Sequence, residues 1–266
     1  MRALGALFRA SWLSAASYRL RMLVTLASLI LAVVPIFFVA RALQPLMAKS
    51  IAQQGGDFFP FVLVGIVAFT VVSASLTSLP DAITNGIQTG TLEALLGTPQ
   101  RLPVLLGGLI SYDIVWSAIR ATLLFVIGLA LGARVNWEHA LLSIGILILI
   151  ALGYLGFGVL AAALTIAFRT SGPLVQGVLT ASALLGGVYY PTSVIPSWVQ
   201  GLSVVIPLTY GLRALRRSLL QRVSLSAIAP DVLTLLCFVV ALLAIGSFAM
   251  ARALRYARRA GTLAQY

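Results

Sequence analysis

Long uncharged stretches alternate with short polar segments along the whole chain. A helix needs about 20 consecutive apolar residues to cross a bilayer, and several stretches approach or exceed that length. The uncharged ranges are 22–40, 58–80, 140–168, 170–212 and 232–251. The pattern predicts an all-α polytopic membrane protein. We expect six transmembrane helices, at about residues 22–40, 58–79, 104–132, 140–168, 173–190 and 232–250.

Prolines and polar residues set the expected boundaries of the first two spans. An interior proline removes a backbone N–H and bends or ends a helix. We therefore expect Pro35 to kink the first span and Pro80 to stop the second. Residues 41–57 are expected to form a polar connection. Residues 80–103 are too polar to span, and they are cytoplasmic if the N-terminus is, because two spans precede them.

Residues 1–21 precede the first span and carry four arginines. Leu4, Phe8 and Trp12 recur every four residues, which places them on one stripe of a helix. This pattern predicts an interfacial helix that lies on the membrane surface. A mobile basic tail is the alternative.

The uncharged stretch 170–212 leaves the number of crossings open. At 1.5 Å per residue it is long enough for two crossings. With six spans, the arginines of 213–222 lie on the outer side of the membrane and the C-terminal arginines lie on the cytoplasmic side. With seven spans, the two groups of arginines are on the opposite sides. The prolines and glycines of 191–212 favour a re-entrant segment made of half-helices. Irregular backbone at membrane depth persists only when it is packed in protein or lines a cavity.

Composition supports a membrane protein and argues against several other classes. The chain is 61% hydrophobic and 9% charged, against about 25% charged in soluble domains. The net charge of +12 comes from arginines beside the apolar stretches, a pattern that indicates contact with membrane lipids and not nucleic acid. Cys237 is the single cysteine, and one histidine with six scattered acids predicts no metal site.

No nucleotide-binding loop is present in the sequence. A P-loop requires GxxxxGK[ST], but the only lysine, Lys49, follows LQPLMA. We therefore expect no catalytic residues and no cofactor in this chain. ATP and Mg²⁺, if the protein uses them, belong to a partner ATPase.

Two sets of residues within the apolar part of the chain are candidates for the transport pathway or for structural polar contacts. Asp113 and Arg120 are seven residues apart with Ser117 between them, so they lie near one helical face. A charge near the bilayer centre costs at least about 2.5 kcal/mol and needs a partner or water. A structural pair satisfied by neighbouring helices is favoured over a substrate contact. Tyr189 and Tyr190 mark a membrane–water interface or line an exit path.

Two motifs in this order resemble the permease subunits of ABC-2 transporters. They are GTLEALLGTPQR at 90–101 and GGVYYPTSVIPSWVQGLSVVIPLTYGLRALR at 186–216. The resemblance covers essentially the whole chain, 1–266, as one transmembrane domain. It implies a half-transporter that works with a second permease copy and with separate ATPase chains. It also implies that the 80–103 segment couples to the ATPase, through Gly90, Thr91, Leu92, Glu93, Thr98 and Pro99.

The resemblance further implies an exporter in the cell inner membrane, with both termini cytoplasmic. Polysaccharide exporters of the family tend to carry Asn-Pro in the second motif, whereas this chain has Ile206-Pro207. The sequence is therefore more similar to exporters of drug-like or lipid-like molecules, with a glycan exporter as the alternative. An ion-coupled carrier or an intramembrane enzyme is a more distant rival, since Asp113 is the only carboxylate inside an expected span.

Overall fold

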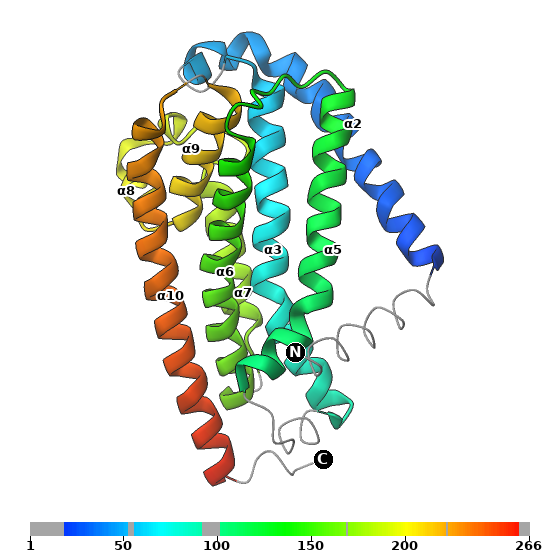
Figure 1. Ribbon diagram of the computed structural model, residues 1–266, viewed down its shortest axis with the longest axis vertical. Coiled ribbons are helices and arrows are strands. Elements are labelled where there is room, and N and C mark those ends of the chain that lie inside the picture. The colour runs from blue at the N-terminus through cyan, green and yellow to red at the C-terminus, as the bar shows by residue number, and fades with distance from the viewer. Residues whose placement is uncertain (1–18, 53–55, 92–101, 169, 222, 261–266) are drawn as a thin grey trace.

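The computed structural model describes residues 19–52, 56–91, 102–168, 170–221 and 223–260. These residues form helices and no strands, and the long helices run side by side as a bundle (Figure 1). The elements are α2 (Arg19–Ile51), α3 (Phe58–Gln88), α5 (Leu102–Ala130), α6 (Ala140–Phe168), α7 (Gly172–Leu185), the short 3-10 helix η2 (Thr192–Val194), α8 (Ser197–Ser203), α9 (Pro207–Leu220) and α10 (Leu225–Ala260). The all-helical membrane fold predicted from the sequence is confirmed.

Five helices are long and apolar enough to cross a membrane: they contain the candidate spans Ala27–Ile51, Phe58–Gln88, Val104–Ala130, Ala140–Phe168 and Leu225–Ala257. The remaining expected span, 173–190, is the 14-residue helix α7. A helix of that length covers about 21 Å, less than the roughly 30 Å of a bilayer core. A count of six crossings therefore remains a prediction.

The first helix is longer than expected. It was expected to end near Ala40, but α2 continues through 41–51 with Pro35 and Pro45 inside it. Gln44 explains part of the extension, because its side chain donates to the Gly56 carbonyl at 2.8 Å and accepts from the Phe58 N–H at 2.7 Å. These bonds hold the end of α2 against the start of α3. Most of the expected polar connection is thus helical.

Pro80 does not stop the second helix, which was the expectation, because α3 continues to Gln88. The proline leaves the carbonyl four residues earlier, that of Leu76, without its helical partner. Gly158 of α6 packs directly on this stretch: a Cβ there would lie 2.7 Å from the Ser75 oxygen and 3.1 Å from the Leu76 oxygen. The backbone of α6 thus lies directly beside the turn of α3 that Pro80 interrupts, and the helix runs on to Gln88, so Asp81 and Asn85 belong to a helix and not to a loop.

Helix α3 is the centre of the bundle, where it packs against α2, α5, α6, α7 and α9. Small residues permit close approach where α6 meets its neighbours. A Cβ on Gly156 would lie 2.7 Å from the backbone of Leu242 in α10, and one on Gly246 would lie 2.6 Å from the Gly156 oxygen. Gly156 and Gly158 are therefore the positions at which α6 closely approaches α10 and α3.

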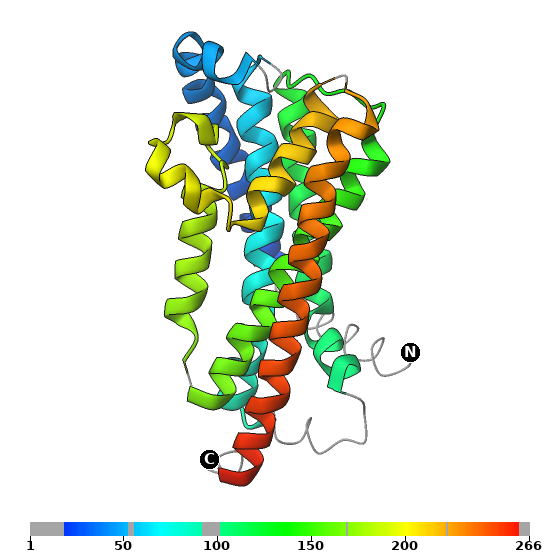
Figure 2. The same ribbon diagram turned by 90° about the vertical axis from the view of Figure 1, so that its left-hand side faces the viewer.

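The proline-rich segment is divided into short helices, as expected. Pro191 precedes η2, Pro196 precedes α8, and Pro207 opens α9. Figure 2 shows α7 and α9 rising in series toward one end of the bundle, with α8 beside their junction. Whether the segment is re-entrant in a bilayer remains a prediction.

The two arginine clusters lie at opposite ends of the bundle. The end of α9 bonds the loop before α6, through the Asn136 N–H to the Leu219 carbonyl at 2.7 Å and His139 Nε2 with the Val223 carbonyl at 3.2 Å. The end of α10 instead packs with Leu79 and Ile83 of α3. Arg213 to Arg217 therefore share an end with residues 133–139, which is the arrangement that six crossings require.

Candidate functional site

A polar cavity of about 520 Å³ lies between α3 and α5. It follows the last half of α3, on the side where the helix ends at the predicted coupling segment. Its lining is polar, which is unusual between two membrane-length helices. The lining residues are Ala74, Thr77, Ser78, Asp81, Ala82, Asn85, Gly86, Thr89, Thr91, Leu109, Tyr112, Asp113 and Arg120.

The spacing of polar residues along α3 produces one wall of this cavity. Ser78, Asp81, Asn85 and Thr89 follow one another at intervals of three and four residues, so they form a single stripe on the helix. Asp113 and Arg120 supply the charges of the opposite wall from α5. The sequence correctly placed these two on one face, but it missed Asp81 and Asn85, because it ended the helix at Pro80.

The charged groups of the cavity form no ion pair with one another or with another described residue, although Arg120 attracts Asp113 at longer range. The ion pairs among the described residues all involve Asp231, at the other end of the bundle. The Arg120 Nε is buried and makes no hydrogen bond. Ser78 is 3% exposed, and its hydroxyl also has no partner. Asp113 and Arg120 thus share a cavity without forming a direct pair, and their role as pathway or structural residues remains a prediction.

The predicted coupling segment, 80–103, starts inside α3, and its described part continues past the end of that helix to residue 91. Gly90 has a φ of 68°, a left-handed conformation that favours glycine, and its N–H bonds the Ile87 carbonyl at 3.2 Å. The hydroxyls of Thr89 and Thr91 lie 2.8 Å apart, and both residues line the polar cavity. Leu92, Glu93, Thr98 and Pro99 lie outside the described residues, as do 1–18 of the expected interfacial helix.

Tyr189 and Tyr190 lie away from this cavity, at the junction between α7 and η2. The Tyr190 hydroxyl donates to the Leu184 carbonyl at 2.7 Å, which caps the end of α7. Tyr189 is exposed. Neither side chain is brought toward Asp113 or Arg120.

A buried arginine at the opposite end was not anticipated. With six spans the arginines of 213–222 were expected outside, but Arg216 is 4% exposed and lies buried among the helices. Its guanidinium donates to the Phe61 carbonyl from Nε at 3.3 Å and from Nη2 at 3.1 Å, and to the Val188 carbonyl at 3.1 Å. It also lies 3.4 Å from the centre of the Phe61 ring. Arg216 therefore joins α9, α3 and the α7–η2 junction.

Glycines make room for this contact. A Cβ on Gly65 would approach the Val188 oxygen to 2.1 Å and the Arg216 Nη2 to 3.0 Å. Gly187, with a φ of 80°, turns the chain after α7 so that the Val188 carbonyl faces the arginine. The sequence signal for this cluster is weak. Gly65 lies one turn after Phe61 in α3, and the pair Gly186-Gly187 comes far later, shortly before Pro191.

The two neighbouring arginines are paired with one acid on α10. Asp231 lies 3.3 Å from Arg213 and 2.8 Å from Arg217, and its side chain is 6% exposed. Arg217 also donates to the Ala227 carbonyl at 2.9 Å. The start of α10 is thereby fixed to α9.

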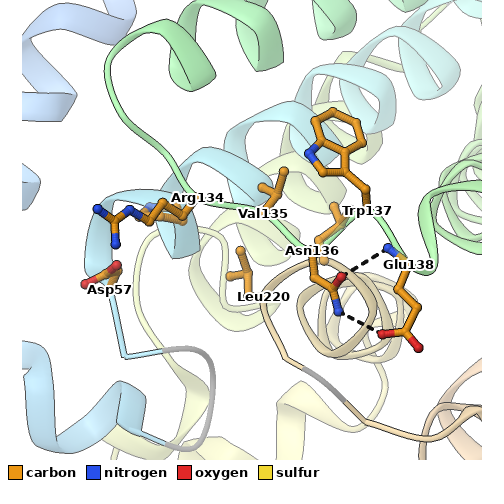
Figure 3. A pocket seen from close by; sticks show the side chains of 9 residues that line it. Asp57, Arg134, Val135, Asn136, Trp137, Glu138 and Leu220 are labelled. Carbon is orange, nitrogen blue, oxygen red and sulfur yellow. Dashed lines mark hydrogen bonds between the residues drawn. The ribbon is translucent and has the colours of Figure 1, made fainter.

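A second polar pocket, of about 450 Å³, lies at this same end of the bundle. Figure 3 shows Arg134 extending toward Asp57 on one side and Asn136 bonded to Glu138 on the other. Asp57 immediately precedes α3, so this pocket and the α3–α5 cavity lie at opposite ends of the same helix. The bundle thus carries polar hollows at both ends and apolar helix surface between them.

Comparison with known proteins identifies the family. No curated protein matches the sequence significantly. The family model for the ABC-2 type transporter matches residues 2–220, which is most of the chain and includes the α3–α5 cavity and the buried arginine. This chain therefore belongs to the ABC-2 type transporter family.

Proposed function

We propose that this transport permease is the membrane subunit of an ATP-driven exporter that moves an amphipathic, drug-like or lipid-like molecule outward across the inner membrane. ABC-2 permeases generally work with a partner ATPase. The nucleotide and Mg²⁺ would be bound there, because this chain has no P-loop. The proposed assembly holds two copies of this chain and two ATPase chains.

The position of α3 is the observation that supports this proposal best. This helix packs against five others and ends at the Gly90 turn, where the coupling segment starts. A packed helix moves as a unit, because close-packed interiors transmit displacement. Movement of residues 90–101 by a partner would thus reach the centre of the bundle directly. Such coupling alters transport only if the substrate binds the two conformations differently.

Two helices offer surface for the second copy. In α7 only Ser182 is buried, and Figure 2 shows this helix at the edge of the bundle. Helix α2 exposes Leu31, Phe38 and Leu46 and leans away from the bundle along its first half (Figure 1). We propose that these faces meet the partner copy and that the path for the substrate lies between the two chains.

Co-purification tests the partnership. The tagged chain is extracted from its native membrane in mild detergent, and bound proteins are identified by mass. We expect a soluble protein that contains GxxxxGK[ST]. Glu93→Ala should weaken its recovery, whereas Glu138→Ala, which removes the same side chain at the opposite end, should not. Recovery of no such ATPase, or equal effects of the two variants, would contradict the proposal.

Vesicles test the direction. Inside-out membrane vesicles that contain the permease and its ATPase should take up an amphipathic dye or a fluorescent lipid analogue when ATP is added. Uptake confined to right-side-out vesicles would indicate import instead.

Single cysteines test the topology in a Cys237→Ser background. Ser197, Ser224 and Tyr256 are exposed positions in the segments concerned. With six spans and cytoplasmic termini, an impermeant thiol reagent on intact cells should label positions 197 and 224 but not 256. Labelling of 256 without 224 would indicate seven spans.

A further inference from the structure

The α3–α5 cavity presents separated charges of both signs. Asp81 and Asp113 provide two carboxylates, and Arg120 provides one guanidinium. None of them is in an ion pair with another described residue. A charge at membrane depth that lacks a direct ion pair is costly, so a ligand that supplies the opposite charges would stabilise the site.

The inner end of the cavity has polar atoms that lack partners although they are buried. The Ser78 hydroxyl, in a residue that is 3% exposed, has no hydrogen-bond partner, and neither does the Arg120 Nε. Buried polar groups in native proteins are nearly always hydrogen-bonded. These atoms are independent of the two carboxylates, and they indicate that a polar ligand group belongs at the inner end.

The order of the charges along the helices defines the ligand. Asp113 and Arg120 are seven residues apart, which is about 10 Å along the axis of α5. The arginine is farther from the end of the bundle that carries the Gly90 turn, and Asp81 is an exposed residue nearer that end. Helical side chains lean toward the N-terminus of their helix, so the long Arg120 side chain reaches back toward Asp113. A ligand entering from this end meets negative charge first and positive charge deeper.

We propose that this cavity binds a zwitterionic headgroup with a primary ammonium and a phosphate, as in an aminophospholipid. In such a lipid the ammonium lies toward water and the phosphate lies nearer the acyl chains. That order matches the cavity, with the ammonium at Asp81 and Asp113 and the phosphate at Arg120 and the Ser78 hydroxyl. A primary ammonium donates hydrogen bonds to carboxylates, which a quaternary ammonium cannot do. Binding requires neither ATP nor a direction of transport, so this inference goes beyond the proposed function.

The test measures which lipid the full-length chain retains. The protein is reconstituted with equal amounts of phosphatidylethanolamine, phosphatidylcholine and phosphatidylglycerol, and bound lipid is counted by native mass spectrometry. We expect phosphatidylethanolamine to be enriched over the other two. Asp113→Asn and Arg120→Gln should each lower its retention about tenfold, the loss that corresponds to a charged hydrogen bond worth about 1.4 kcal/mol.

Matched controls come from the opposite end of α3. Asp57→Asn and Arg134→Gln remove the same charges from the pocket of Figure 3 and should leave retention unchanged. Asp81→Asn, at an exposed position, should lower retention even if Arg120→Gln fails to fold. Equal retention of the three lipids, or equal effects of the variants at the two ends, would overturn the proposal.

Competition with free phosphoethanolamine distinguishes a site for a soluble aminophosphate from a site for the intact lipid. If it displaces the lipid at comparable concentration, the site recognises a soluble aminophosphate through the headgroup alone. If it does not, the site recognises the intact lipid, and the acyl chains contribute to binding. The zwitterion assignment is supported in either case. Failure of the ATPase co-purification would leave this lipid measurement intact, so the two proposals fail separately.

Discussion

Arg216 and Arg120 are both arginines within the body of the helix bundle, yet their surroundings differ. Arg216 makes three hydrogen bonds to the carbonyls of Phe61 and Val188 and lies on an aromatic ring. Arg120 lines a cavity with two carboxylates, pairs with neither, and keeps a buried Nε without a partner. The fold itself supplies hydrogen-bond acceptors for the first charge, whereas the second forms no ion pair with a described residue.

This difference separates structure from function inside one membrane domain. A buried charge that the protein compensates stabilises the arrangement of helices around it. A charge that the protein leaves uncompensated lowers stability, and such positions are typical of binding sites, where stability is given up for activity. Substitutions in the two regions should therefore have opposite effects on folding and on binding.

The largest effect on stability is expected for Arg216→Met. Loss of the guanidinium removes three hydrogen bonds and leaves the Val188 carbonyl buried without its partner. We expect a loss of about 3 kcal/mol, the upper end of the cost of leaving a buried hydrogen-bonding group without its partner. Thermal unfolding of the detergent-purified protein measures it. Arg213→Met is the control, since that side chain is 46% exposed; equal unfolding temperatures for the two variants would show that Arg216 is not a structural centre.

A somewhat smaller effect is expected for Gly65→Ala. The new methyl group would lie 2.1 Å from the Val188 oxygen, so the α7–η2 junction has to move. Overpacking of this kind costs about 1–3 kcal/mol. Gly145→Ala in α6 is the control: nothing lies within 4 Å of a Cβ there, and alanine should stabilise the helix by up to about 1 kcal/mol. Two changes of the same sign in the unfolding temperature would contradict the packing argument.

Asp231→Asn should have a modest effect. The substitution removes the carboxylate from the pairs with Arg213 and Arg217, whose side chains are 46% and 35% exposed. Solvent screens such pairs, so we expect a loss of about 1 kcal/mol. The same unfolding assay, repeated at high salt, should show a smaller difference from the unmodified chain. A loss as large as that of Arg216→Met would place the main contact of α9 at Asp231 instead.

The smallest effect on stability is expected for Asp113→Asn, the same chemical change made in the α3–α5 cavity. Asp113 has no ion pair to lose, so stability should stay within about 0.5 kcal/mol or rise, while lipid retention falls. Unfolding and retention are measured on one preparation. Destabilisation beyond that of Asp231→Asn would mean that Asp113 is a structural residue, which is the reading that the sequence favoured.

The sequence determined the class of fold because the membrane imposes a simple rule. Apolar helices must be long enough to cross hydrocarbon, so the long apolar stretches predicted α5 and α6 to within two residues at each end. The sequence also predicted that Asp113 and Arg120 share a face, since helical periodicity is local. Its two motifs, with their order, indicated the family to which the chain belongs.

Tertiary structure decided the features that depend on neighbours. Helix α3 continues past Pro80 while Gly158 of α6 packs closely on the backbone of Ser75 and Leu76, and this continuation brings Asp81 and Asn85 into the cavity wall. Arg216 is buried because Gly65 and the turn at Gly187, far apart in the sequence, present two carbonyls to it. The local sequence pattern predicts how long a helix is and which of its faces is polar. Whether a charge on that face finds a partner is determined by helices that approach from distant parts of the chain.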